Sequence, residues 1–368
     1  MSDHAGVSGT QDPTCDHLVM TAYLVPIDGL TLTEPWQLGA VTLRDADGAR
    51  ALITAQHPLA GQAVRDFADG LTGVVGHVSA ETIDEATDLI TTALDVLRVF
   101  QQATAVVQTT MFGLPGDVLQ SRVDYLALED EVKGAGWKHR GQHLGSTFDS
   151  QRHGDFRDSG FAFAAAAIGQ EAPSEGELRA LLGLELASRA ILEHRPPLRL
   201  LSAVMAAEAM LLDRSKQPQA LRLARRSVYL LCEGPEQSLC GRDRPTCLYL
   251  AHSPETNGGR EGLRELRARG NTDTRWRCSE WHQVMDWYDA RSGVAHGGAE
   301  PVDEEEASRV VFWLANDLVP AMLTWLAEHP ADPLANLESA IAALPDPPDW
   351  EALIAEKGDS AAPGQSAP

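Results

Sequence analysis

The periodicity of apolar residues changes near residue 174, and this change constrains the fold more than any other feature of the chain. Upstream, short alternating segments such as Leu30–Thr33 and Ala40–Arg44 are typical of half-buried strands. Thr82–Gln101 differs, because its apolar residues recur at helical spacing over about five turns. Downstream, the apolar segments have helical spacing. The sequence therefore predicts an α+β fold, with a mixed N-terminal part followed by an all-α bundle.

Turn-forming residues divide the N-terminal part further. Residues 45–48 (Asp-Ala-Asp-Gly) have turn composition, so we expect a further strand at Ala51–Thr54, and Thr104–Met111 also has β composition. The segment 134–160 is rich in Gly, His, Asp and Arg, and we expect it to include an irregular connector. Four histidines have no metal-ligand spacing, which favours a solvated loop over a metal site: His57, His139, His143 and His153.

The C-terminal part begins with a helix-start signal. Ser174 followed by Glu177 predicts an N-cap and its reciprocal acid. Acids at 304–306 and the pair Gly297-Gly298 suit a helix start and a helix stop. The expected helices are 178–192, 198–212, 219–232, 261–269, 279–296, 301–328 and 333–343.

This pattern predicts four regions. They are a flexible leader (1–16), an α+β domain of unknown role (17–165), a helical domain (175–330) with a cysteine-containing insertion (about 232–278), and a short helix with a disordered tail (331–368).

Charge is unevenly distributed. The net charge of −23 argues against a broad phosphate-binding surface, so any nucleic-acid site must be local. Between Arg222 and Arg291 there are 12 Arg against 10 Asp and Glu, which is the one Arg-rich stretch of the chain. Two interpretations stay open: a local basic site, or a high arginine content that reflects only GC-rich coding.

The chain shows no targeting or membrane signal by composition. Residues 1–13 are polar, and the apolar run 161–168 is far shorter than the roughly 20 residues that span a bilayer. We therefore expect a cytoplasmic protein that does not enter a membrane.

The most informative motif lies at the end of the helix expected at 279–296. Tyr288, Ser292 and His296 follow one another at four-residue spacing, and Arg291 shares their side of the helix. Arginine can bind phosphate oxygens, and histidine can transfer a proton near neutral pH. This pair suits metal-free RNA cleavage, in which the ribose 2′-OH attacks the adjacent phosphate. The alternative is a histidine that only caps the helix, with the spacing arising by chance.

The run 287–298 (WYDARSGVAHGG) resembles the signature of the ApeA-like branch of the HEPN superfamily: an aromatic residue, Arg-Ser, a short apolar spacer and His-Gly. The resemblance extends to residues 198–212, where Glu208 lies within an apolar segment, and to 222–231. It covers about 195–315.

The resemblance implies a helical bundle that dimerises, with two Arg–His motifs meeting across the dimer cleft to form a ribonuclease site. Arg291 and His296 would be the catalytic pair, and Glu208, Tyr288 and Ser292 supporting residues. No metal is required for this catalysis. Members of the superfamily act in phage defence, in toxin–antitoxin pairs and in RNA processing, while some only bind. Many have Asn, Asp or His where this chain has Ser292, directly after the arginine.

Glu208 needs a partner whatever its role, because an unpaired carboxylate in an apolar helix is costly. Arg225, Arg226 and Arg291 are the candidates, and a structural ion pair and a catalytic role both stay open.

Four of the five cysteines lie between residues 232 and 278. In a reducing compartment such a cluster suggests structural zinc, but the paired short spacing of ordinary zinc sites is missing. The weak zinc candidates are Cys232, Cys240, Cys247 and Cys278.

Two functions from different classes therefore compete. The first is a metal-independent HEPN-type endoribonuclease, acting in phage defence or as a toxin. Its N-terminal domain would sense a trigger, such as a regulatory protein or a phage component, or would block the site. The second is a catalytically inactive HEPN module that binds RNA, a nucleotide or a protein partner, which the net charge of −23 favours. A zinc hydrolase built on the histidine-rich segment lacks any supporting ligand spacing.

Overall fold

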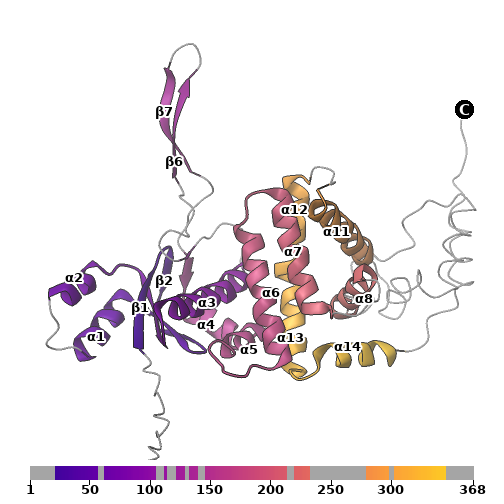
Figure 1. Ribbon diagram of the computed structural model, residues 1–368, viewed down its shortest axis with the longest axis horizontal. Helices are drawn as coiled ribbons and strands as arrows, with labels where there is room; N and C mark the ends of the chain where they lie inside the picture. Colours follow the sequence, from indigo (N-terminus) through magenta and orange to yellow (C-terminus); the bar gives the residue numbers. More distant parts are fainter. Residues whose placement is uncertain are drawn as a thin grey trace, which may run out of the picture.

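A computed structural model describes nine stretches of the chain (Figure 1). The N-terminal part contains strands β1–β4, helices α1 and α2, strand β5 and helix α3 in this order, and the elements after residue 150 are helices. The described residues are 21–56, 62–104, 112–113, 122–128, 132–139, 146–213, 219–232, 279–297 and 302–344. Within these ranges the chain is mixed α+β, with a small N-terminal sheet and a mostly helical C-terminal part, as the sequence predicts.

The N-terminal sheet has four antiparallel strands in the order β1-β5-β4-β3. Its strands are β1 (Thr21–Ile27), β3 (Trp36–Leu38), β4 (Val41–Asp45) and β5 (Val74–Ala80). Two smaller pairs accompany it: the parallel pair β2 (Leu30–Leu32) and β8 (Ser146–Phe148), and the antiparallel hairpin β6 (Arg122–Leu128) and β7 (Val132–His139). The hairpin projects away from the other elements in Figure 1.

Helices cover both faces of this sheet (Figure 1). Helix α3 (Ile83–Thr104) packs on one face, where the absence of a side chain at Gly76 admits Ile90: a Cβ at Gly76 would lie 2.9 Å from Ile90 Cδ1. Helix α1 (Ala46–Gln56) packs on the other face through a separate small apolar cluster that includes Ile53 and Val75. Helix α2 (Gln62–Gly70) follows α1.

One expectation for the N-terminal part is wrong. The strand expected at 51–54 is part of helix α1, because Asp45 accepts a hydrogen bond from the Gly48 N–H over 2.7 Å and so begins a helix, where we expected a turn. In the segment 134–160, the described residues form the end of β7, then β8 and α4 (Ser150–Arg157), which Asp149 caps. The expected irregular connector can be checked only there, because residues 140–145 lie outside the described part of the chain. Of the β segment expected at Thr104–Met111, Thr104 is the last residue of α3, and residues 105–111 lie outside the described part of the chain.

The predicted helices after residue 174 are confirmed wherever the structure describes them. Ser174 and Glu177 form the expected capping box at the start of α6. The expected helix at 261–269 and the tail lie outside the described residues. The observed helices are α5 (Gly160–Ala166), α6 (Glu175–Leu192), α7 (Pro196–Leu211), α8 (Gln219–Leu231), α11 (Ser279–Ala295), α12 (Glu304–Phe312), α13 (Val319–Glu328) and α14 (Pro333–Ala342).

The long helix expected at 301–328 is interrupted by a π-helical segment, η2 (Trp313–Leu318), between α12 and α13. Pro320, the second residue of α13, cannot donate a backbone hydrogen bond, which favours a local change of helical pitch. Glu304–Glu328 is long and apolar enough to span a membrane by composition alone, but 56% of its apolar window is buried inside the protein. It is therefore a core helix of this fold.

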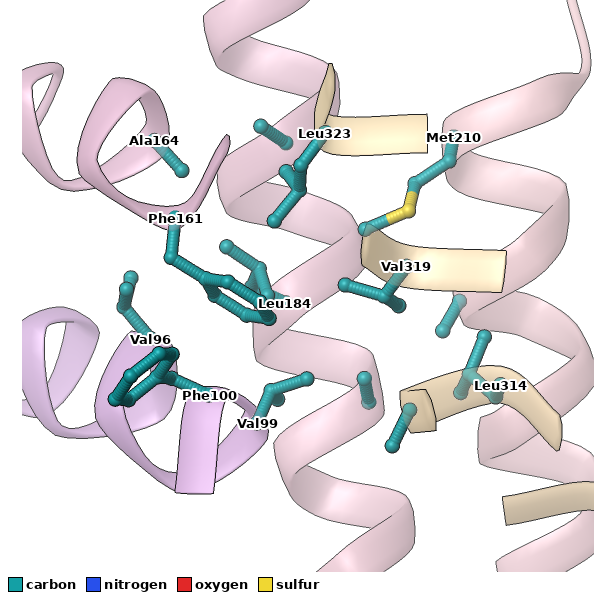
Figure 2. Close-up of a cluster of buried hydrophobic side chains, with 14 of the residues drawn as sticks. Val96, Val99, Phe100, Phe161, Ala164, Leu184, Met210, Leu314, Val319 and Leu323 are labelled. Carbon is teal, nitrogen blue, oxygen red and sulfur yellow. The ribbon is translucent and has the colours of Figure 1, made fainter. Parts of the chain in front are cut away.

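One hydrophobic core runs from the sheet into the helical bundle. Figure 2 shows Phe100 of α3 beside Phe161 of α5. Leu184 of α6 and Val319 of α13 belong to the same buried cluster. A buried polar cluster crosses the same boundary. Arg98 of α3 donates to Asp95 over 2.7 Å, to the Ser188 hydroxyl of α6 over 3.3 Å and to the Phe112 carbonyl over 2.9 Å. Packing is thus continuous between the two predicted domains.

Candidate functional site

The motif helix α11 packs against α7 and α8 (Figure 1). Its inner face is apolar: Val284 and Trp287 are buried, and the Trp287 ring lies 5.0 Å from that of Trp313 in η2. Because Trp287 anchors this face, the next residue, Tyr288, and Arg291 one turn later are directed along α7 and α8.

Arg291 forms an ion pair with Glu208 of α7. Its Nη2 donates to Glu208 Oε2 over 2.8 Å, and the side chains are only 24% and 15% exposed. Of the three arginines that were candidate partners of Glu208 in the sequence, Arg291 is the one that pairs with it. Arg225 and Arg226 instead pair with Glu338 of α14.

The ion pair uses only part of each group. Glu208 Oε1 and Arg291 Nε are both buried and have no hydrogen-bond partner among the described residues. Nε and Nη2 form one edge of a guanidinium, the edge that binds a carboxylate through two bonds. Glu208 therefore occupies this edge through one bond, and the Nη1 end of Arg291 is the part left for another ligand.

Tyr288 covers the face of the same guanidinium. The Arg291 Cζ atom lies 5.7 Å from the centre of the Tyr288 ring, within the range of a cation–π contact. The Tyr288 hydroxyl donates to Gln219 Oε1 at the start of α8 over 3.2 Å. Gln219 is a site residue that was not predicted from the sequence. The one signal that could have indicated it is a polar side chain at the first position of an expected helix.

Burial dominates the electrostatics of this cluster. It raises the pKa of Glu208, and the nearby Arg291 guanidinium opposes that rise without cancelling it. Burial also raises the pKa of Tyr288, and the negative charge of Glu208 adds to the effect. Tyr288 therefore stays a neutral hydrogen-bond donor at neutral pH.

His296 follows the last residue of α11 and is exposed. Its backbone N–H donates to the Ser292 carbonyl over 3.1 Å, which keeps it at helical spacing from the motif. Gly297 then ends the helix with φ of +70°, a conformation that favours glycine. Within the described residues, His296 has no side-chain hydrogen bond, so its imidazole is open to a ligand. Ser292 is half-buried.

The arginines of α8 have structural contacts. Arg226 is 1% exposed and donates to Glu338 Oε1 over 2.7 Å and to the Leu211 carbonyl. Arg222 pairs with Asp213 through both carboxylate oxygens. This part of the Arg-rich stretch therefore joins α7, α8 and α14 and does not form a free basic surface.

The structure describes one of the four cysteines that are zinc candidates. Cys232 is buried just after the end of α8, while Cys240, Cys247 and Cys278 lie outside the described residues. In the described part of the chain, no group of three or more His, Cys, Asp or Glu residues could hold a metal ion. A zinc site at the four cysteines stays a prediction.

Of the four histidines noted in the sequence, the structure gives side-chain contacts for His153. It lies on α4, where we expected a solvated loop; its Nδ1 is 3.0 Å from Glu34 Oε1 and its ring stacks on Trp36 at 4.7 Å. His139 ends β7, and His57 and His143 lie outside the described residues.

No family model, curated protein or solved structure matches this chain.

Proposed function

We propose that the chain is a metal-independent endoribonuclease of HEPN type, with Arg291 and His296 as its catalytic pair. One observation carries this proposal. Arg291 is fixed on one edge by Glu208 and on one face by Tyr288, and the exposed His296 follows five residues later at the end of the same helix. Phosphodiester cleavage without a metal needs a fixed cation and an accessible imidazole, and the end of α11 carries one of each.

In the proposed reaction, His296 accepts the proton of a ribose 2′-OH. The 2′ oxygen attacks the adjacent phosphorus, and the bond between phosphorus and the 5′ oxygen of the next nucleotide breaks. The leaving oxygen takes a proton from an imidazolium, supplied by His296 or by the His296 of a second copy. The Nη1 end of Arg291 binds the phosphoryl oxygens, whose negative charge grows in the transition state.

Glu208 and Tyr288 are positioning residues in this scheme. Glu208 holds the Nε–Nη2 edge of Arg291, and Tyr288 limits rotation of the guanidinium plane. A pre-oriented guanidinium loses less side-chain entropy when it binds phosphate. A larger part of the binding free energy is then available to lower the activation barrier of cleavage.

The wider setting is also part of the proposal. The substrate is RNA, the active form is a homodimer through the helical part, and the compartment is the cytoplasm. The biological role is phage defence or toxicity, with the N-terminal part responding to a phage trigger or a regulatory protein.

The test is cleavage of labelled single-stranded RNA in EDTA. We expect cleavage by the wild-type chain, no cleavage of the all-deoxy oligonucleotide, and loss of activity in His296→Ala. His194→Ala is the matched control, since His194 is also exposed beside a helix end. Activity that persists in His296→Ala, or that extends to the deoxy substrate, contradicts the mechanism.

A second candidate is an inactive module that binds RNA, a nucleotide or a protein. The Glu208–Arg291 ion pair supports it, since the negative charge of Glu208 offsets part of the positive charge that Arg291 would offer to a cleavage transition state, and binding alone needs no such stabilisation. The net charge of −23 also weakens the capture of an RNA substrate. This function predicts that Arg291→Ala weakens RNA binding although wild-type protein cuts no RNA. Arg309→Ala, which removes an exposed arginine of α12, is the control.

A further inference from the structure

Helix α6 exposes a stripe of side chains that nothing in the described chain covers. Leu178 and Leu182 are 54% and 49% exposed, although leucine is usually buried. On the neighbouring helix α7, Met205 is 37% exposed. These are three of the seven large apolar side chains that are exposed among the described residues, and α6 packs directly against α7 (Figure 1).

The spacing of this stripe is that of a helix–helix seam. Glu175, Leu178, Leu182, Glu185 and Arg189 follow one another at alternating intervals of three and four residues. This 3–4 alternation keeps side chains on one narrow face of a helix and is typical of the contact line between two packed helices. The stripe is apolar at its centre and charged at both ends.

The charges at the two ends fit a second copy of the same helix. Two ion pairs lie along α6: Arg179 Nε to Glu175 Oε1 over 2.8 Å, and Arg189 to Glu185. The order along the helix is Glu175, Leu178, Arg179, Leu182, Glu185 and Arg189, so the stripe begins with a negative charge and ends with a positive one.

An antiparallel copy centred on Leu182 meets this order with opposite charges. Glu175 then faces the partner's Arg189, and this contact occurs at both ends of the seam. Arg179 takes no part, because it is only 17% exposed and donates to the Ala209 and Leu212 carbonyls of α7. A parallel copy in register would place like charges together, which is unfavourable. The sequence of α6 is thus complementary to itself in one orientation and one register.

We propose that the exposed stripe of α6 (Glu175, Leu178, Leu182, Glu185 and Arg189) is the interface for a second copy of this chain. The two copies are related by a twofold axis that crosses α6 at Leu182. In such an interface each residue contact occurs twice, and only a residue on the axis meets itself.

The axis also passes close to the candidate site. Arg179 Nη1 donates to the Ala209 and Leu212 carbonyls of α7, so the centre of α6 lies beside the C-terminal half of α7, which carries Glu208. A face-to-face twofold at this level brings α7 opposite the partner's α7. The interface itself does not rest on the proposed function.

Disulfide trapping tests the register. We expect Leu182→Cys to form a covalent dimer under mild oxidation, because residue 182 faces itself. Leu178→Cys, which faces the partner's Leu186, should form little or none, and the wild-type chain reports the background from its own cysteines. Equal trapping at both positions, or trapping at neither, overturns the proposed register.

Charge exchange tests the interface without a new cysteine. The mass in solution is measured by light scattering for Arg189→Glu and for the double variant Glu175→Arg with Arg189→Glu. We expect a dimer for the wild type, a dissociation constant raised at least tenfold in the single variant, and recovery in the double variant. A monomeric wild type, or a double variant no better than the single, contradicts the interface.

The two proposals fail in different ways. RNA cleavage by a chain that is monomeric at the assay concentration removes the interface and the homodimer, and leaves the Arg291–His296 chemistry. A dimer with the expected trapping pattern that cuts no RNA removes the ribonuclease and leaves the interface.

Discussion

Arg291 of α11 and Glu208 of α7, which are 83 residues apart in sequence, form a half-buried ion pair of 2.8 Å. The pair joins the motif helix to the centre of the bundle and sets the direction in which the guanidinium points. It is therefore both a stability element and the basis of the proposed site.

Removing Glu208 should destabilise the fold. Glu208→Ala leaves the guanidinium of Arg291, which is only 24% exposed, without its carboxylate, and we expect the free energy of unfolding to fall by about 1–3 kcal/mol. Urea denaturation measures the change. Glu305→Ala, which breaks the exposed pair of α12 with Arg309, is the control and should cost about 0–0.5 kcal/mol. Equal effects would mean that the Glu208 pair is no more than a surface contact.

The buried pair Asp95–Arg98 should make stability depend on pH. Burial raises the pKa of Asp95 to about 6, so the folded state holds a proton that the unfolded state has released. A raised folded pKa stabilises the fold at low pH, and this contribution is lost as the pH rises through 6. Relative to Asp95→Asn, the wild type should gain about 1 kcal/mol in free energy of unfolding between pH 7 and pH 5. A difference that stays constant over this range contradicts the assignment.

Helix α14 should depend on Glu338. Arg226 is 1% exposed and donates to Glu338 Oε1 over 2.7 Å, so Glu338→Ala leaves a buried guanidinium with fewer acceptors. We expect a loss of about 2–4 kcal/mol in thermal or urea unfolding. The neighbouring Ser339→Ala removes only an exposed hydroxyl and should change stability by less than about 0.5 kcal/mol. If the two variants unfold alike, α14 is not held by this pair.

Two nearby glycines should respond oppositely to alanine. A Cβ at Gly160 would lie 2.7 Å from the backbone carbon of Leu323, so Gly160→Ala must push α5 away from α13 and should cost about 1–3 kcal/mol. Gly154 in α4 has open space around it, and Gly154→Ala should stabilise the protein by about 0.5–1 kcal/mol. Thermal unfolding of both variants measures these changes in stability. A Gly160→Ala variant that is more stable than the wild type would refute the close contact between α5 and α13.

Local signals in the sequence predicted much of the helical part. The Ser174–Glu177 capping box and the stop at Gly297 depend on residues within one turn, so they can be read without tertiary information. The same local reasoning was wrong at Asp45. An Asp-Ala-Asp-Gly segment suits both a turn and a helix start, and the apolar face with Ala49 and Ile53 settles the choice only once the sheet is formed.

The site shows the same division. The spacing of Arg291 and His296 on one helix was visible in the sequence, whereas the partner of Glu208 was not, because three arginines were equally available. The choice depends on how α7 and α11 cross, which is a property of packing between distant segments. Gln219 was missed for the same reason, since only the fold brings it to the Tyr288 hydroxyl.

The ends of the RNA products test the central claim most directly. Attack by the 2′-OH with Arg291 and His296 as the catalytic pair predicts fragments that carry a 2′,3′-cyclic phosphate and a 5′-OH, in EDTA. Both should disappear in His296→Ala and persist in His194→Ala. Mass spectrometry of the products identifies these ends. Fragments with a 3′-OH and a 5′-phosphate, or the same cyclic ends in His296→Ala, would contradict the account.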